Sequence, residues 1–269
     1  MKKNKLLLFL CIKYNGDFMI KIGDIVTRYK YNNDCLFRVT DIKDNIYYLT
    51  GVNVRLYAST TENDLKKEEI RINDEEILDC IDIKPIDYRD DYFYLPGKIL
   101  HIDADEDYLK RCLKYYKKVG LNAYGILDKE EYLSKNIDKY LEDIKPDIVV
   151  ITGHDVYFKE KKQYKNSIFF EKAVEKARKY EKSYEKLKII AGACQSDFEN
   201  LIKSGANFAS SPKKVNIHAL DPAIVASIIA LTENTKELDL IDTLKKTKCG
   251  SDGIGGIKCY GSMFVGYPK

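Results

Sequence analysis

Apolar and polar residues alternate in the first part of the chain with the two-residue period of β-strands. Four short segments rich in β-branched and aromatic residues are separated by Asn, Asp and Gly turns, and they span residues 20–28, 36–42, 46–50 and 52–57. Their spacing predicts a small SH3-like β-barrel over residues 19–60. A highly charged stretch containing Pro85 and Pro96 follows, and it indicates a linker over residues 61–97.

From residue 98 onward, short apolar runs alternate with segments of helical period. Strands are expected at residues 99–102, 123–127, 148–152, 187–191 and 207–210. Helices are expected between them, and Asp221-Pro222 is a strong start for an apolar helix up to residue 231. This order predicts an α/β domain over residues 98–235, with an open parallel sheet and helices on both faces. The Gly-rich C-terminal extension, residues 236–269, is compatible with short strands or with a mobile flap.

The charge pattern changes this picture little. The chain has 269 residues, with 45 Lys and Arg against 42 Asp and Glu, for a formal net charge of +3. Because the two signs are interleaved, they indicate solvated helix faces, and no nucleic-acid partner is expected.

The N-terminal extension, residues 1–18, contains an apolar run of residues 6–12 that is too short to span a membrane, so no membrane partner is expected. No small-residue cleavage site follows this run. The codons of Gly16-Asp17 can resemble a ribosome-binding site just before Met19, so Met1 and Met19 both remain possible starts.

Seven Cys residues are scattered along the chain. None forms a CxxC pair or a Cys/His cluster with zinc spacing, so neither a metal nor another cofactor is expected. An odd count without close pairs is typical of a reducing compartment.

Three residues with reactive or charged side chains follow predicted strands directly: Asp103, His154 and Cys194. Open parallel sheets place their sites at the carboxyl ends of strands, so these residues are expected at one edge. Cys194 precedes a helix for which Ser196 is the predicted N-cap and Glu199 completes a capping box. A helix start is expected to favour the thiolate.

This arrangement indicates Cys194 as a nucleophile and His154 as its base. Gly153, Asp155 and Ala193 flank the pair and are expected to line the site. The backbone N–H of Cys194, together with one near His154, is expected to form an oxyanion hole. The other two His residues have simpler interpretations, since His101 lies inside a predicted strand and His218 precedes a helix cap.

Several stretches of the sequence resemble known peptidases. A predicted strand that ends in His, followed by one that ends in Ala-Cys, resembles the arrangement in caspase-type peptidases. Four longer runs, ITGHD (151–155), YKNSIFF (164–170), AGACQS (191–196) and GANFASSPKKVNIHALDP (205–222), resemble the YabG family of sporulation-specific cysteine peptidases. The resemblance extends from about residue 21 to the Gly-rich tail. One departure is Asp155, which stands where caspase-type enzymes usually have Gly after the His.

The resemblance implies a caspase-like sheet and a cysteine endopeptidase with a Cys194–His154 dyad. It implies spore coat and cortex-associated proteins as substrates, cleavage after basic residues, and self-cleavage. It also implies a location in the cytoplasm of the sporulating mother cell and then at the spore coat or forespore surface. A basic residue before the cut requires an acid in the pocket, for which Asp103, Asp155 and Asp197 are candidates, although Asp103 could instead orient His154.

Two other classes remain open. One is a non-catalytic adaptor that binds spore proteins through its barrel, and the other is a Cys-dependent amide hydrolase that acts on small molecules. The sequence leaves the natural substrates and the oligomeric state undecided.

Overall fold

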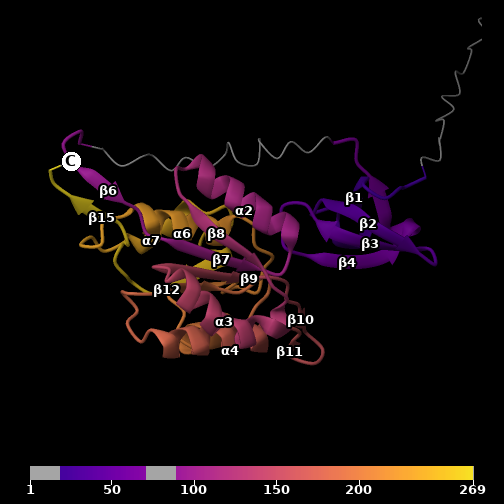
Figure 1. Cartoon of the computed structure of the whole chain (residues 1–269). Coiled ribbons are helices and arrows are strands. Elements are labelled where there is room, and N and C mark those ends of the chain that lie inside the picture. Colours follow the sequence, from indigo (N-terminus) through magenta and orange to yellow (C-terminus); the bar gives the residue numbers. More distant parts are fainter. Residues whose placement is uncertain (1–18, 71–88, 269) are drawn as a thin grey trace, which may run out of the picture.

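The computed structural model describes residues 19–70 and 89–268. It contains a five-stranded antiparallel sheet within residues 19–70 and a larger α/β part within residues 89–268 (Figure 1). The predicted extension at residues 1–18, and with it the question of the start at Met19, lies outside the described residues.

The antiparallel sheet has the strand order β4-β3-β2-β1-β5. Buried and exposed residues alternate along β2 and β3, and the buried set includes Phe37, Val39 and Leu49. One face of the sheet therefore forms its own small hydrophobic core. The strands are β1 (Ile25–Arg28), β2 (Phe37–Lys43), β3 (Ile46–Gly51), β4 (Tyr57–Thr61) and β5 (Leu65–Lys67), with 3₁₀ turns at Tyr29–Tyr31 and Glu62–Asp64.

The predicted strand at residues 52–57 is wrong. Residues 52–56 leave the sheet after β3, and the next strand begins only at Tyr57. Their backbone groups pair outside the sheet, because Ala219 donates to the carbonyl of Asn53 over 2.9 Å and the Tyr108 hydroxyl donates to that of Val54 over 2.7 Å. The last strand of the sheet, β5, lies within the range expected to be a linker.

The α/β part is built on a six-stranded sheet of order β14-β13-β12-β9-β7-β8. All neighbours are parallel except β14, which runs antiparallel to β13 at one edge. The expected mostly parallel α/β sheet is confirmed. The strands are β7 (Ile99–Asp103), β8 (Ala123–Leu127), β9 (Ile148–Thr152), β12 (Lys188–Ala191), β13 (Phe208–Ser210) and β14 (Ile254–Gly256).

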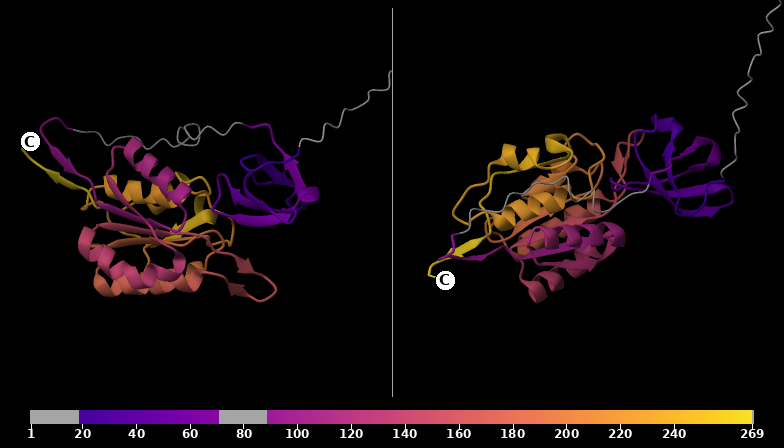
Figure 2. Two further views of the ribbon diagram at one scale, coloured as in Figure 1. Left: turned by 45° about the vertical axis from the view of Figure 1, so that its right-hand side comes forward. Right: turned by 90° about the horizontal axis from the view of Figure 1, so that it is seen from above.

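Helices cover both faces of this sheet (Figure 2). One core joins α2 and α6 to side chains such as Ile99 and Val150, and a second core joins α3, α4 and α5 to Leu100 and Val149. Alternate residues of the same strands thus enter opposite cores, and the central strands β7, β9 and β12 are buried on both sides, whereas β8 at the edge is partly exposed. The helices are α2 (Glu106–Lys118), α3 (Glu130–Ile144), α4 (Ser167–Tyr180), α5 (Phe198–Lys203) and α6 (Asp221–Leu231).

The Gly-rich tail carries short strands, which was one of the two interpretations of its sequence, together with short helices that were not expected. They are α7 (Leu240–Lys245), α8 (Gly250–Gly253), β14 and β15 (Phe264–Gly266), and β15 pairs with β6 (Phe93–Leu95). A small hairpin of β10 (Tyr157–Phe158) and β11 (Gln163–Tyr164) precedes α4.

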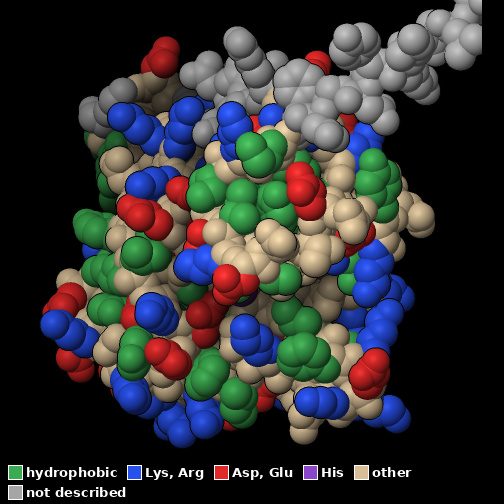
Figure 3. All heavy atoms as spheres, turned by 90° about the vertical axis from the view of Figure 1, so that its right-hand side faces the viewer, with side chains coloured by type: hydrophobic (Ala, Val, Ile, Leu, Met, Phe, Trp, Pro, Cys, Tyr) green, Lys and Arg blue, Asp and Glu red, His purple; other side chains and the backbone are tan. Residues whose placement is uncertain are grey.

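On the side of the molecule that carries the antiparallel sheet, basic, acidic and hydrophobic side chains lie next to one another (Figure 3). Within the described residues, no helix is both long and apolar enough to cross a bilayer.

Candidate active site

The strand register brings the three predicted residues to one edge of the sheet. Asp103 ends β7 opposite Thr152, the last residue of β9. Ile151 of β9 pairs with Ala191 of β12, so His154 and Cys194 each lie three residues beyond a paired position. Neighbouring strands lie roughly 4.8 Å apart, so the two segments leave the sheet side by side. All three side chains are buried.

Cys194 sits in a tight turn after β12. Gly192 takes φ +111°, and a Cβ there would lie 3.2 Å from that of Ser210, so the turn requires Gly. The predicted capping box is wrong, because Asp197 caps α5 while the Ser196 hydroxyl accepts from the backbone N–H of Ala193 over 2.7 Å.

The thiol of Cys194 is enclosed by backbone groups. Ile217 donates its N–H to Sγ over 3.2 Å, and the thiol donates to the carbonyl of Ile217 over 3.7 Å. Burial raises the pKa of the thiol to about 11, although the N–H of Ile217 and the charge and backbone N–H of Arg55 act in the opposite direction. The expected acidic thiol is therefore wrong for this conformation, since α5 is short and begins only at Phe198.

His154 is held by aromatic and acidic side chains. Its ring stacks on Tyr57 with 3.8 Å between centroids and 16° between planes. Its Nε2 lies 3.7 Å from Asp105 Oδ2, and its Nδ1 lies 3.8 Å from Glu130 Oε1. Glu130 also accepts the backbone N–H of His154 over 2.8 Å, and Tyr57 donates to Asp105 over 2.6 Å.

The Nε2 atom of His154 is buried and has no hydrogen-bond partner among the residues the structure describes. Such an unpaired buried atom is unusual and fits a site of proton transfer. Within the same residues, no hydrogen bond joins His154 to Cys194. The structure thus brings the two residues to one edge without linking their side chains.

Asp103 lies at the centre of a buried polar cluster. It forms an ion pair with Arg55, and it accepts hydrogen bonds from the Thr152 hydroxyl over 2.8 Å and the Asp105 N–H over 3.0 Å. Burial opposes ionisation, but Arg55 and His101 outweigh it and hold the pKa of Asp103 well below its usual range. His101 is fully buried and contacts the hydroxyls of Tyr116 and Thr152, in keeping with a core residue.

The other two acidic candidates lie elsewhere. Asp155 accepts from the N–H groups of Val156 and Asn166 and from the Ser167 hydroxyl, so it organises the loop before α4. Burial raises the pKa of Asp155 despite these hydrogen bonds. Asp197 lines a separate cavity of about 280 Å³ that also contains Lys214.

The backbone around the pair offers two N–H groups. The N–H of Cys194 and that of Asp155 donate to no group in the described residues, whereas those of His154 and Ala193 are engaged. Gly153 packs against Glu130, the acid next to His154, because a Cβ on Gly153 would lie only 2.7 Å from Glu130 Oε1.

Four residues of this site were missed or given other roles by the sequence: Arg55, Tyr57, Asp105 and Glu130. Glu130 and Asp105 follow strands of the same edge, so their place in the chain was a usable signal. Arg55 lies in the connection between β3 and β4 and Tyr57 begins β4, and no local pattern connects either residue with the α/β part. Within the described residues, no group of three His, Cys, Asp or Glu side chains could hold a metal ion.

The fold and these residues define an α/β protein with a buried Cys and His at the carboxyl edge of its sheet, and the comparisons give the class. The family model described as YabG peptidase U57 matches residues 21–268. The chain belongs to this peptidase family.

A relative in Bacillus subtilis (strain 168), named sporulation-specific protease YabG, is 40% identical over 283 aligned residues. The alignment covers 92% of this chain and 98% of the relative. A solved cobalamin-binding protein from Desulfitobacterium hafniense is 19% identical, covers 47% of this chain and 55% of its own, and has a TM-score of 0.33, too low to support an argument.

Proposed function

We propose that the protein is a cysteine endopeptidase in which Cys194 is the nucleophile and His154 the general base. The observation that carries the proposal is the matched position of the two residues, three residues beyond paired strands, in a chain of a peptidase family. The unpaired Nε2 of His154 supports its role as the proton acceptor.

The reaction proceeds in two steps. His154 takes the proton of the Cys194 thiol, and the thiolate attacks the carbonyl carbon of a peptide bond. The N–H groups of Cys194 and Asp155 stabilise the oxyanion, and His154 returns the proton to the leaving amine. Water, deprotonated by His154, then hydrolyses the thioester and releases the new carboxyl terminus. In the described residues the imidazole of His154 stacks on Tyr57 and makes no hydrogen bond to Cys194. The imidazole must therefore move towards the sulfur before it can take the proton.

Asp103 is the acid that selects a basic residue before the cut. Its ionised, fully buried carboxylate already binds a guanidinium, which is the geometry that an Arg side chain of a substrate requires. Asp155 suits this role less, because its carboxylate already accepts hydrogen bonds from its own loop. Asp197 suits it less because its carboxylate caps α5. Asp105 and Glu130, not Asp103, orient His154.

The biological setting follows the relative. A sporulation-specific protease at 40% identity supports a role in sporulation for this chain. We extend this to spore coat and cortex-associated proteins as substrates, in the mother-cell cytoplasm and then at the coat or forespore surface. Self-cleavage belongs to the same proposal, because a chain with 45 Lys and Arg contains many possible sites.

The test compares wild type, Cys194→Ala and Cys259→Ala on a Lys/Arg-rich coat protein, followed on gels over time. Cys259 is also buried, so its variant controls for loss of a core thiol. Wild type and Cys259→Ala are expected to cut after basic residues, and Cys194→Ala is expected to be inactive. Equal cutting by Cys194→Ala would contradict the proposal, and turnover of small amides without peptides would favour the hydrolase alternative.

A further inference from the structure

The connection between β3 and β4, residues 52–56, contacts the candidate active site directly, as does Tyr57 at the start of β4. Arg55 is fully buried although it belongs to a connection between strands. Its guanidinium pairs with Asp103, donates to the Ala219 carbonyl over 3.2 Å, and lies 5.0 Å from the Tyr108 ring centroid. The side chain thus fills a pocket of the α/β part that has an acid at its base.

The backbone on either side of Arg55 lies along the α/β part as an added strand would. Val54 forms an antiparallel bridge with His218, and Ala219 donates to the Asn53 carbonyl over 2.9 Å. Peptides that bind by strand addition use main-chain hydrogen bonds of this kind for affinity and pockets for specificity. Ile217, the residue before His218, contacts the thiol of Cys194, and the backbone N–H of Arg55 faces the same thiol. The backbone of residues 52–56 therefore passes beside the proposed nucleophile.

The segment is held at several further points. The Tyr108 hydroxyl donates to the carbonyls of Gly51 and Val54, and Arg111 donates to that of Val52. Beyond Arg55, Tyr57 covers His154. The Leu56 N–H donates back to the Val54 carbonyl over 2.9 Å, so the backbone folds into a tight turn around Arg55. A substrate in an extended conformation does not have this turn.

We propose that residues 52–56 occupy the groove that binds extended Arg-containing peptides, and that Arg55 fills the pocket of Asp103 in place of a substrate Arg. The protein therefore closes its own active site until the segment leaves. This inference rests on the proposed function, because only a peptidase would bind substrate peptides in this groove. A purely structural connection between the two parts of the chain would not need to bury an Arg against Asp103 and to continue into Tyr57, whose ring covers the imidazole.

The experiment measures peptide binding in full-length chains that carry Cys194→Ala, so the result does not depend on cleavage. The probe is acetyl-Asn-Val-Arg-amide, which has the sequence of residues 53–55, and acetyl-Asn-Val-Gln-amide is its matched control. Calorimetry is run on the Cys194→Ala chain and on the same chain with Arg55→Gln. The Arg55→Gln chain is expected to bind the Arg probe at least tenfold more tightly and to ignore the Gln probe.

Two further variants guard against misfolding and general loosening. Tyr108→Phe removes the hydroxyl bonds to the segment but leaves Arg55 and Asp103 in place, and it is expected to tighten probe binding by a smaller factor. Arg28→Gln breaks a different Arg–Asp pair, between Arg28 and Asp64, and is expected to leave the affinity for both probes unchanged. Unchanged probe affinity in both Arg55→Gln and Tyr108→Phe would overturn the inference, as would equal binding of the two probes.

The two proposals fail in different ways. If the wild type cuts proteins after basic residues but neither variant gains affinity, only the closure of the groove is wrong. If the probe binds as expected and Cys194→Ala still cuts proteins, the groove stands and the assignment of the nucleophile is wrong.

Discussion

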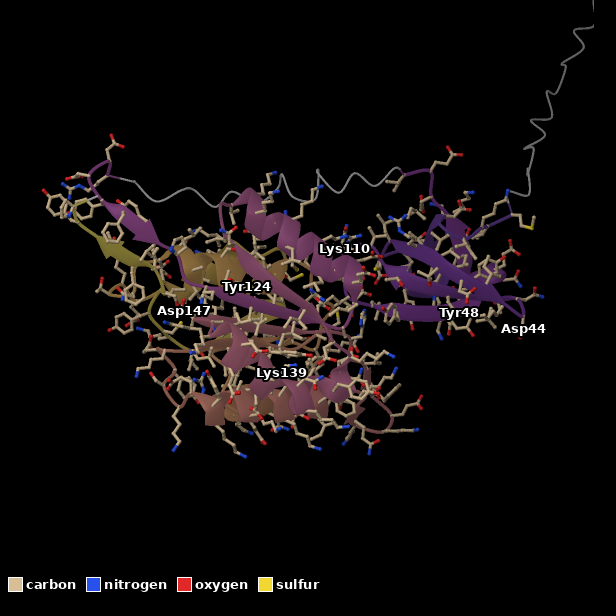
Figure 4. The ribbon with its side chains drawn as sticks, viewed as in Figure 1. Asp44, Tyr48, Lys110, Tyr124, Lys139 and Asp147 are labelled. Carbon is tan, nitrogen blue, oxygen red and sulfur yellow. The ribbon has the colours of Figure 1, made fainter. Side chains whose placement is uncertain are left out.

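The two ends of the parallel sheet each bury a cation but use it differently. At the carboxyl ends, Arg55 pairs with the ionised Asp103 next to His154 and Cys194. At the amino ends, Lys188 donates to the carbonyls of Glu185 and Gly261 over 2.6 and 3.0 Å. Figure 4 shows Asp147, from this amino end, on the side away from the antiparallel sheet, whose Asp44 and Tyr48 lie at the opposite side.

The surroundings of the two cations differ in chemistry. Lys188 contacts mainly backbone oxygens and borders an open cavity of about 430 Å³. Burial lowers its pKa, and its contacts are those of a residue that joins the tail to the sheet. Arg55, in contrast, is fully buried and pairs with a carboxylate, Asp103. Its Nε atom has no hydrogen-bond partner in the described residues. The proposed reaction therefore belongs to the carboxyl edge, where the buried cation lies among titratable side chains, and not to the amino edge, where it contacts mainly backbone oxygens.

The largest expected effect is on catalysis. His154→Ala removes the proposed base and is expected to lower kcat by roughly 10²–10⁴-fold, the range measured for general bases. Lys188→Met, at the opposite edge, is expected to leave kcat within about twofold of wild type. Initial rates on an Arg-containing fluorogenic peptide check both, and a similar loss in the two variants would break the comparison.

The second effect is on stability. Arg55→Met or Asp103→Leu alone leaves one buried charge unpaired and is expected to lower the free energy of unfolding by about 3–5 kcal/mol. The double variant is expected to lose less than either single variant, since no charge remains. Denaturant titrations of all four chains give the coupling energy, and additive losses would contradict the buried pair.

The third effect depends on pH and on His218, which lies beside residues 52–56. Burial, with the charges of Lys248, Arg111 and Arg55, lowers its pKa from 6.5 to about 4. The folded state therefore favours the neutral ring, whose stabilisation is complete above pH 6.5 and is lost as the pH falls towards 4. The contribution is up to about 3 kcal/mol. Between pH 4 and 7, the free energy of unfolding is expected to depend less on pH in His218→Gln than in wild type. The same pH dependence in the two chains would contradict this prediction.

The smallest effect is at the amino end. Lys188→Met leaves the carbonyls of Glu185 and Gly261 without their donor and is expected to cost about 1–2 kcal/mol of stability. Thermal unfolding measures this loss, and peptide affinity measured by calorimetry is expected to stay unchanged. If Lys188→Met lowered the free energy of unfolding more than Asp103→Leu does, the amino edge would contribute more to stability than the carboxyl edge, which is the opposite of the expected order.

The sequence predicted the parallel sheet and the edge of the site because both depend on local signals. Apolar runs ending at Asp103, His154 and Cys194 place those residues at strand ends whatever the rest of the chain does. The same reasoning failed for residues 52–57, since the alternation in VNVRLY is also compatible with a strand. Their actual partners, Asp103, Tyr108 and Ala219, lie about 50 to 160 residues further along the chain.

The chemistry of the thiol was not predictable for a related reason. The short helix after Cys194 suggested an acidic thiol, but burial of the side chain raises its pKa more than the N–H of Ile217 and the charge of Arg55 lower it. Both of these groups come from segments distant from Cys194 in the sequence. Similarly, nothing near Tyr57 in the sequence indicates that its ring lies against His154.

The most direct measurement is covalent labelling by an arginyl peptide with an electrophilic ketone at its carboxyl end, followed by peptide mapping. Wild type is expected to gain one label on Cys194, Arg55→Gln to gain it faster, and Cys194→Ala to gain none. A label that persists in Cys194→Ala, or one that maps to Cys112 or Cys259 in wild type, would contradict the assignment of the nucleophile.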